Sequence, residues 1–348
     1  MRIVIFDTWL PQAHRKLYNS IIELLSKDNS LIVINKNNYY DCVSNNIVYK
    51  NIPLLDLDHG GLWYKRLAHF FNFFLARISI IGERYDLSLV TTYHTRHFEW
   101  QYRWMCKKPV LIIEHYNVDD IASSSMLCHY LNYANKVHHL VFAPFIGDYI
   151  NTLGVNNDNI HFIHHPLFTV NNPVARKEKN AFTSVLSPGL SNDESIIESI
   201  IEYEKKNGIL AKNSIKLTLR TNKDYNNVPA PIKFMKGFLT KDEYESLYNT
   251  SDYVLVIYPP SYRFRFSSVI LNSMTKHKVL IGNNIDIVHY FSEKYPTNCL
   301  MFDSVKTFFD LIIEKPQFSE EERNIFIEEH SNESIEREIN NILTNILS

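Results

Sequence analysis

Residues 253–282 read YVLVIYPPSYRFRFSSVILNSMTKHKVLIG. In this stretch, Tyr253–Ile257 and Val279–Ile281 are short apolar runs that predict buried strands, and Ser268–Thr275 has the apolar spacing of a helix. A loop, Tyr258–Phe266, separates the first strand from the helix. The order strand, loop, helix, strand is typical of the βαβ unit of a parallel sheet. The stretch therefore predicts an α/β fold.

The same alternation of short apolar runs and amphipathic stretches extends to both sides of this segment. Further strands are expected at Ile3–Phe6, Leu31–Ile34, Leu87–Val90, Val110–Ile113, Leu140–Phe142, Thr183–Leu186, Ile215–Leu219 and Ile232–Met235. Helices are expected at 14–27, Glu194–Glu204, Lys241–Tyr248 and in the tail from Ser319. The pattern pauses at His164-His165-Pro166 and in the polar stretch after it, which is a composition shift typical of a domain boundary.

The expected organisation is an N-terminal domain over 1–166, a C-terminal domain over 167–330, and a last helix over 331–348 that packs back towards the N-terminal domain. Both domains are expected to be Rossmann-like, doubly wound α/β sheets that face a central cleft. In such sheets, ligands bind at the carboxyl ends of the strands, where the strand order reverses.

Composition excludes several classes of protein. The chain has 348 residues, a formal net charge of −2 and 9 glycines, and it contains neither G-x-G-x-x-G nor G-x-x-x-x-G-K-[ST]. Glycine-rich phosphate loops are therefore excluded, and the near-neutral charge argues against nucleic acid as a partner. No run of 18 apolar residues predicts a membrane span. The four dispersed cysteines and the lack of a leader pattern favour a cytoplasmic location.

The start of the expected helix at Ser267 or Ser268 is a candidate anion site, because a helix N-terminus offers backbone N–H groups and the positive end of the dipole. Arg263 and Arg265 precede it and can clamp a diphosphate. Asn272 lies one turn deeper on the same face and can reach a ribose hydroxyl. The alternative interpretation is a capped helix with two solvated arginines.

This segment resembles the C-terminal domain of GT-B glycosyltransferases, particularly family 4 (group 1). Leu271-Asn272-Ser273-Met274 stands where that family has L-E-A-M, and Lys278–Ile281 stands where it has K-P-V-V. Ile232–Leu239 resembles the family segment that surrounds the nucleobase, which implies that Gly237, Phe238 and Leu239 lie near the base. Ser187–Leu190 resembles the first glycine loop of that domain. The resemblance therefore adds Gly189 and Tyr258, at the end of its strand, to the expected donor site.

The chain departs from the family pattern at the two glutamates of the E-x(7)-E motif, which fall at Phe264 and Asn272. Asparagine can still bind a ribose, but phenylalanine cannot replace a carboxylate. The basic residues that follow the first glycine loop in the family are also missing. Arg220 or Lys223 can supply positive charge together with the two loop arginines, although Arg220 can equally be a surface charge at a strand edge.

In the N-terminal domain, Val110–His115 resembles the family strand that ends in a histidine. The resemblance implies that His115 contacts the transferred sugar or activates the acceptor, and an imidazole suits general-base catalysis. A structural role for His115 stays open. His94 ends the preceding strand and is expected at the mouth of the cleft, whereas His164-His165 is interpreted as structural.

No metal ion or further cofactor is expected besides the nucleotide-diphosphate sugar that serves as donor. His138-His139 and His164-His165 are adjacent pairs, and neighbours on a strand point to opposite faces. The resemblance implies catalysis without a metal ion, in which the helix dipole and arginines stabilise the leaving diphosphate.

Residues 62–81 read LWYKRLAHFFNFFLARISII. Aromatic residues beside Lys65, Arg66 and Arg77 are typical of a helix that lies on an anionic membrane surface. The alternative is a buried crossover helix, although its four phenylalanines cover much of the helix circumference. If the membrane interpretation holds, the acceptor is lipid-linked.

Together these features predict a cytoplasmic, peripherally membrane-bound hexosyltransferase. It transfers a sugar from a nucleotide-diphosphate sugar to a hydroxyl of a surface polysaccharide, such as lipopolysaccharide or capsule, or of a lipid-linked glycan. The missing glutamates support an alternative, a non-catalytic GT-B-like subunit that stabilises a partner glycosyltransferase. A sugar-nucleotide epimerase ranks last, because the sequence places no carboxylates in the expected cleft.

Overall fold

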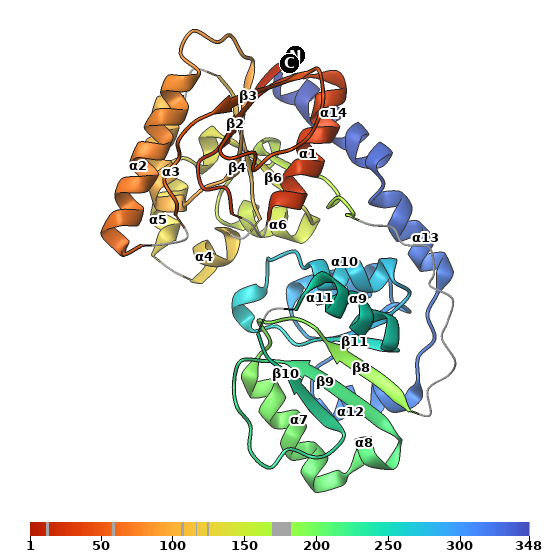
Figure 1. Cartoon of the computed structure of the whole chain (residues 1–348). Helices are drawn as coiled ribbons and strands as arrows, with labels where there is room; N and C mark the ends of the chain where they lie inside the picture. The colour runs from red at the N-terminus through yellow and green to blue at the C-terminus, as the bar shows by residue number, and fades with distance from the viewer. Residues whose placement is uncertain are drawn as a thin grey trace. The chain divides into compact units, whose positions relative to one another are not determined.

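The computed structural model describes residues 1–11, 14–57, 60–105, 108–115, 117–123, 125–168, 182–237 and 239–347. The chain divides into two compact units (Figure 1). Unit 1 comprises Met1–Phe168 with Glu329–Ser348, and unit 2 comprises Thr169–Glu328. Each unit is a parallel sheet with helices on both faces, which is the doubly wound α/β fold expected from the sequence.

Unit 1 contains a seven-stranded sheet of order β3-β2-β1-β4-β5-β6-β7. Its strands are β1 (Arg2–Asp7), β2 (Ser30–Asn35), β3 (Ile47–Asn51), β4 (Leu87–Thr92), β5 (Val110–Ile113), β6 (His138–Val141) and β7 (Ile160–Phe162). Its helices are α1 (Arg15–Asp28), α2 (Leu62–Ser79), α3 (Thr95–Met105), α4 (Asn117–Ser123), α5 (Met126–Leu131), α6 (Pro144–Thr152) and α14 (Asn332–Leu347). The strand order reverses between β1 and β4, so their carboxyl ends form the switch point of this unit.

The last helix, α14, packs beside the first helix, α1, on one face of this sheet (Figure 1). Lys27 of α1 forms an ion pair with Glu336 at 2.5 Å, and Asn340 Nδ2 donates to Asp28 Oδ2 at 2.9 Å. Beneath these polar contacts, Ile339, Ile342 and Leu343 of α14 line one apolar pocket together with Ile21 and Leu25 of α1. The end of the chain is thus part of the core of unit 1.

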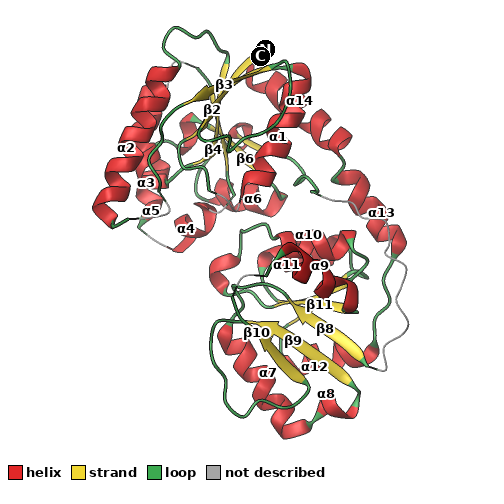
Figure 2. Ribbon diagram, in the orientation of Figure 1, coloured by secondary structure: helices red, strands yellow, loops and turns green. Residues whose placement is uncertain are grey.

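Unit 2 contains a six-stranded sheet of order β10-β9-β8-β11-β12-β13, all parallel (Figure 2). Its strands are β8 (Thr183–Ser187), β9 (Ile215–Arg220), β10 (Ile232–Met235), β11 (Tyr253–Val256), β12 (Val279–Asn283) and β13 (Cys299–Phe302). Its helices are α7 (Glu194–Asn207), α8 (Ile209–Lys212), α9 (Lys241–Thr250), α10 (Ser268–Thr275), α11 (Asp286–Lys294), α12 (Val305–Glu314) and α13 (Glu320–Glu329). The order reverses between β8 and β11.

The core of unit 2 explains why its strands are apolar throughout. Side chains from β8, β9, β11 and β12 meet those of α7 and α12 on one face of the sheet. Helices α9, α10 and α11 cover the opposite face (Figure 2). A parallel sheet buried on both faces requires near-continuous apolar strands. This burial confirms the expected strands of the second domain, including the βαβ unit formed by β11, α10 and β12.

Candidate functional site

The carboxyl-end edge of the unit 2 sheet gathers most of the residues predicted to bind the donor. β8 and β11 are neighbours at the switch point of this sheet. The loop that leaves β11 leads through a short 3₁₀ turn, Pro260–Tyr262, into α10. The start of α10 therefore lies at the edge where ligands of such sheets bind.

Ser267 is the N-cap of α10, as the sequence predicts. Its Oγ accepts a hydrogen bond from the backbone N–H of Val269 at 3.1 Å, and the hydroxyl of Tyr258 contacts the same oxygen. The carbonyl of Ser267 accepts from Ile270 and Leu271. Ser268, the first helical residue, is exposed. Since the cap already takes up these amides, an anion here depends mainly on the helix dipole and on the preceding arginines.

The two loop arginines have different surroundings. Arg263 donates from Nε and Nη2 to the carboxylate of Asp286 at 2.7 and 3.1 Å, which lowers the pKa of Asp286. The guanidinium of Arg265 lies over the ring of Tyr262, 4.5 Å from its centroid. The carboxylate of Asp286 takes up the two guanidinium N–H groups of Arg263 that a phosphate would bind. Arg263 is therefore the weaker of the two candidates for the diphosphate.

Arg220 is not a surface charge, because its guanidinium, at the end of β9, binds the loops that follow β8 and β10. It ends β9 and is buried, and burial lowers its pKa. Its Nε and Nη2 donate to the carbonyl of Gly237 at 2.9 and 2.6 Å, and its Nη1 donates to that of Pro188 at 3.3 Å. Gly237 has a φ of +71°, in the left-handed region that favours glycine. Arg220 therefore fixes the loop after β10.

Gly189 follows β8 and lies near Asn192 and Tyr258. A Cβ atom at this position would come within 3.4 Å of Asn192 Oδ1 and 3.6 Å of Tyr258 Cε1. Asn192 in turn donates to the carbonyl of Arg220 at 2.8 Å. Both Cβ distances are ordinary van der Waals contacts, so the space at Gly189 would accept a Cβ atom.

Tyr258 is held by Asn283, which the sequence analysis missed. The backbone N–H of Tyr258 donates to Asn283 Oδ1 and Asn283 Nδ2 donates to the carbonyl of Tyr258, both at 2.9 Å. Tyr258 is buried, and this burial raises its pKa. These two hydrogen bonds between the Asn283 side chain and the Tyr258 backbone hold the ends of β11 and β12 together. A lone asparagine at a strand end gives no sequence signal for such a role.

In this chain, Phe264 and Asn272 stand at the positions of the two glutamates of the family motif. Phe264 is buried, with 2% of its side chain exposed, so it offers no polar atom to a ligand. Asn272 is half-buried, and its Nδ2 donates to the hydroxyl of Tyr244 at 3.2 Å. Leu239 is half-buried as well. Phe238 lies outside the described residues.

In unit 1, the predicted catalytic residue His115 directly follows Glu114 at the carboxyl end of β5. Its ring lies 4.3 Å from that of His14, 6.0 Å from that of Phe142 and 6.4 Å from that of His165, measured between centroids. Burial lowers the pKa of His165 to about 4, so its imidazole is neutral near pH 7. His115 is only partly buried. It therefore lies among rings at the strand ends, where a ligand can reach it.

Glu114, adjacent to His115, is a fully buried carboxylate that the sequence analysis did not pair with any residue. It accepts from the hydroxyl of Tyr93 at 2.8 Å, and Nδ1 of the equally buried His139 lies 2.9 Å away. Nε2 of His139 faces the carbonyl of Ala134 at 2.9 Å. Both ring nitrogens thus face oxygen atoms of buried groups, and the hydroxyl of Tyr130 also lies 3.2 Å from Nδ1. The result is a buried pair of a carboxyl group and an imidazole in hydrogen-bond contact.

The loop after β1 is held by a second buried carboxylate, Asp7. Asp7 Oδ1 accepts from the backbone N–H groups of Trp9 and Leu10 at 3.0 and 2.8 Å, and Oδ2 accepts from the hydroxyl of Tyr40 at 2.6 Å. Burial raises the pKa of Asp7. Leu10 has a φ of 57°, so the carboxylate stabilises a strained turn. Trp9 is thereby fixed at the switch point of unit 1.

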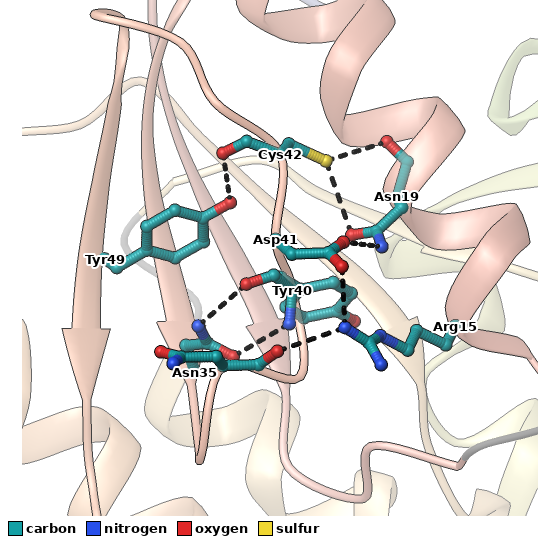
Figure 3. A network of polar contacts seen from close by, with 8 residues as sticks. Arg15, Asn19, Asn35, Tyr40, Asp41, Cys42 and Tyr49 are labelled. Carbon is teal, nitrogen blue, oxygen red and sulfur yellow. Dashed lines mark hydrogen bonds and ion pairs between the residues drawn. The ribbon is translucent and has the colours of Figure 1, made fainter.

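Tyr40 itself is positioned by the polar network in Figure 3. Asn35 Oδ1 accepts from the backbone N–H of Tyr40 at 3.0 Å, and Asn35 Nδ2 donates to its carbonyl at 3.2 Å. Arg15 and Asn19 of α1 both bind the carboxylate of Asp41. This network anchors the loop between β2 and β3 to α1 (Figure 3), and through Tyr40 it supports Asp7.

No protein-family model and no curated protein sequence matches the chain. Its fold, however, matches solved structures over almost its whole length. Sucrose-phosphate synthase from Thermosynechococcus elongatus has a TM-score of 0.71 at 12% identity, covering 99% of this chain and 98% of that one.

Two further structures cover 99% of both chains at 12% identity. They are HepE from Anabaena in complex with UDP-glucose, with a TM-score of 0.64, and the lipopolysaccharide outer core galactosyltransferase WaaB, with a TM-score of 0.65. These neighbours, together with two parallel sheets of the same winding, identify the architecture. The chain has the GT-B fold. At this level of identity the likeness establishes the fold, and function must be argued from the site.

The described residues contain neither a candidate metal site nor a candidate membrane span. Among the residues that the structure describes, no group of three or more His, Cys, Asp or Glu side chains is arranged to hold a metal ion. Within the same part of the chain, no helix combines the length and apolar character needed to cross a bilayer.

Proposed function

We propose that this chain is a hexosyltransferase that moves a sugar from a nucleotide-diphosphate sugar to a hydroxyl group of a surface polysaccharide or lipid-linked glycan. The observation that carries the proposal is the β11–α10 loop of a GT-B fold, where Arg265 precedes a capped helix start at the switch point. HepE, a structural neighbour, was solved with UDP-glucose, which supports a nucleotide sugar as donor. The diphosphate would lie near Arg265 and Ser268, and the ribose near Asn272.

The proposed chemistry needs no metal ion. Positive charge from Arg265 and from the N-terminal end of α10 would stabilise the leaving diphosphate. On unit 1, His115 would take the proton from the acceptor hydroxyl or contact the transferred sugar. The base would lie near Gly237 and Leu239, whose loop is fixed by Arg220.

The donor site can be tested by calorimetry with UDP, GDP and UDP-glucose. Arg265→Ala is expected to weaken the binding of the nucleotide roughly 10- to 100-fold, because a hydrogen bond to a charged group contributes about 1.5–3 kcal/mol. The matched control is Arg263→Ala with Asp286→Asn, which removes one arginine without changing the net charge and should leave affinity within about threefold. Equal losses in both variants would contradict the assignment.

The same titration separates the proposed enzyme from the alternative, a non-catalytic subunit that stabilises a partner glycosyltransferase. The buried Phe264 at a glutamate position and the amides already capped by Ser267 support that alternative. An enzyme should bind at least one nucleoside diphosphate and hydrolyse its sugar slowly in the absence of acceptor. If none of the tested nucleotides binds, the proposed transferase activity is wrong.

We further propose that the protein is cytoplasmic and binds a membrane surface through α2. One side of this helix packs on unit 1 through Ala68, Phe73 and Ala76. The other side exposes a stripe of large apolar residues at helical spacing, comprising Trp63, Tyr64, Leu67, Phe70, Phe71, Phe74 and Ile78. The helix therefore has a solvent-facing apolar side, and the alternative, a buried crossover helix, holds only for its packed side.

The charges of α2 support an anionic lipid surface as the partner. The helix carries Lys65, Arg66 and Arg77 and no acidic residue. The guanidinium of Arg66 lies 5.5 Å from the ring of Trp63. Aromatic rings favour the interfacial zone of a bilayer, and each basic residue near an anionic surface adds about 1 kcal/mol. A membrane-bound acceptor, such as a lipid-linked glycan, is consistent with this geometry.

Vesicle flotation tests the membrane proposal. The chain is expected to float with vesicles that contain phosphatidylglycerol, and less with neutral phosphatidylcholine vesicles or at high salt. Leu67→Asp with Phe74→Asp should abolish flotation, because two carboxylates would enter the interface. Ile325→Asp, at an exposed site on α13, is the control and should float normally. Flotation of the double variant would contradict a role for α2.

A further inference from the structure

The side chain of Arg265 in unit 2 is oriented by an aromatic ring. Arg265 is half-buried, and its guanidinium carbon lies 4.5 Å from the centroid of the half-buried ring of Tyr262. Tyr262 ends the short 3₁₀ turn and precedes Arg265 by three residues, so both side chains come from one loop. A guanidinium is attracted by the negative face of an aromatic ring. Tyr262 therefore restricts the positions that Arg265 can take.

Tyr262 is itself held at its backbone, its ring and its hydroxyl. Its backbone N–H donates to the carbonyl of Pro259 at 2.9 Å, and its ring centroid lies 5.5 Å from that of the buried Tyr258. Its hydroxyl donates to Oγ of Ser191 at 2.6 Å, which joins residues 71 positions apart in the sequence. Since three parts of the residue are fixed, the ring offers a constant surface to the guanidinium.

The loop after β8, which carries Ser191, is tied to two other strands of the sheet. Asn192 is buried, and its Nδ2 donates to the carbonyl of Arg220 at the end of β9, at 2.8 Å. The backbone N–H of Asp193 donates to the carbonyl of Ile257, directly after β11, at 2.7 Å. Ser191 is therefore a firm anchor, and its hydrogen bond to the tyrosine links two loops at the switch point of unit 2.

The two arginines of the β11–α10 loop are thus held in different ways. Arg263 lies 5.1 Å from the ring of Phe264, but it also forms a bidentate ion pair with Asp286, which offsets its charge and accepts two of its N–H groups. The ring of Tyr262 is uncharged and accepts none of the five guanidinium N–H groups of Arg265 through its hydroxyl, which donates to the serine. The ring contact therefore restricts Arg265 without reducing its positive charge.

An ordered arginine binds a phosphate more tightly than a mobile one. The side chain loses rotamer freedom when it binds, and a side chain that is already ordered loses less. We propose that Tyr262, anchored by Ser191, is the positioning residue that orders the guanidinium of Arg265 for the diphosphate of the donor. This inference rests on the proposed donor site and names the residues that order it before the ligand arrives.

Calorimetry on the full chain, with inorganic pyrophosphate and with UDP and GDP, tests the proposal. Tyr262→Leu is expected to weaken the binding of pyrophosphate and of the nucleotide about fivefold or more, because the cation–π contact is lost. In Arg265→Ala, the same substitution should cause no further loss of nucleotide affinity, because the group that Tyr262 orders is absent. Tyr290→Leu removes another half-buried ring of unit 2, which lies 5.9 Å from Nζ of Lys294, and as the matched control it should leave affinity unchanged.

The hydroxyl and the ring of Tyr262 can be tested separately. Tyr262→Phe keeps the ring and removes only the hydrogen bond to Ser191, so affinity should fall about two- to threefold. Ser191→Ala should have the same effect. The double variant should bind no more weakly than either single variant, because both substitutions remove the same hydrogen bond.

The Nε–H signal of Arg265 in the ¹⁵N-arginine-labelled chain gives a measure that needs no ligand. The signal is assigned by its loss in Arg265→Ala. The ring of Tyr262 should shift it upfield, and Tyr262→Leu should move it to the range of a solvated arginine. A signal that Tyr262→Leu leaves in place would overturn the proposal.

Two calorimetric results would also overturn it. One is an affinity of Tyr262→Leu within about twofold of the wild-type value. The other is an equal loss with and without Arg265, which would mean a structural role. If pyrophosphate binding depends on Tyr262 and Arg265 while no nucleotide binds, this inference stands and the proposed transferase function is wrong. If neither pyrophosphate nor any of the nucleotides binds, both are wrong.

Discussion

Replacing Glu114 by alanine is expected to lower the free energy of unfolding of unit 1 by several kcal/mol, because each buried polar group left without its partner costs about 1–3 kcal/mol. Neither Glu114 nor His139 is exposed to solvent. The substitution also removes the acceptor of the Tyr93 hydroxyl and opens a cavity below the ends of β4 and β5. Since Tyr93 and Glu114 directly precede His94 and His115, the spacing of these two candidate residues should loosen as well.

Tryptophan fluorescence during urea unfolding measures this effect in unit 1 alone. All four tryptophans, Trp9, Trp63, Trp100 and Trp104, belong to that unit. Glu114→Gln keeps the volume and one acceptor and should lose less stability. Glu114→Met with His139→Leu removes both polar groups and should recover part of the loss. A loss below about 1 kcal/mol in Glu114→Ala would show that the pair is not formed.

Replacing His115 by alanine is expected to lower the turnover number about 10²- to 10⁴-fold, the usual contribution of general acid–base catalysis. The affinity for the nucleotide should not change, because the proposed donor site lies on unit 2. The reaction to follow is the transfer of the sugar to water from whichever nucleotide sugar binds in calorimetry. This measurement does not require the natural acceptor.

A second histidine variant, His161→Ala, is the control for the loss of a half-buried imidazole ring. His161 is half-buried on β7, and burial lowers its pKa to about 4. His161→Ala should therefore retain wild-type turnover. If His115→Ala keeps its turnover number within about threefold while binding the nucleotide normally, His115 has the structural role that its sequence context leaves open.

The sequence predicts the interior of both sheets, because strands buried on both faces are continuous apolar runs. Strands β1, β2, β4 and β5 are buried over nearly their whole length. The strands that the sequence analysis missed, β3, β7 and β13, all lie at sheet edges. Each is half-exposed over part of its length. Strands β3 (IVYKN) and β7 (IHF) lack the longer apolar run that marks an interior strand, whereas β13 (CLMF) has one and could have been predicted.

The site was predictable where a local rule applies and not where distant residues meet. Ser267 caps α10 as its position before an apolar helix suggests. Arg263 and Arg265 look alike in sequence, yet only the fold brings Asp286 to Arg263. The Glu114–His139 pair and the clamp of Asn283 on Tyr258 each join residues 25 positions apart. Their polar atoms are fixed by register between strands, which no motif records.

The packing of α14 against α1 also constrains the order in which the protein can fold during synthesis. Unit 2 ends at Glu328, so its whole sequence leaves the ribosome before α14 does. Until then, Ile21 and Leu25 of α1 lack the apolar partners that Ile339, Ile342 and Leu343 provide. Domains usually complete folding from the N-terminus onwards. Here the unit that emerges first is completed last, and its nascent form would present an apolar surface that a chaperone could bind.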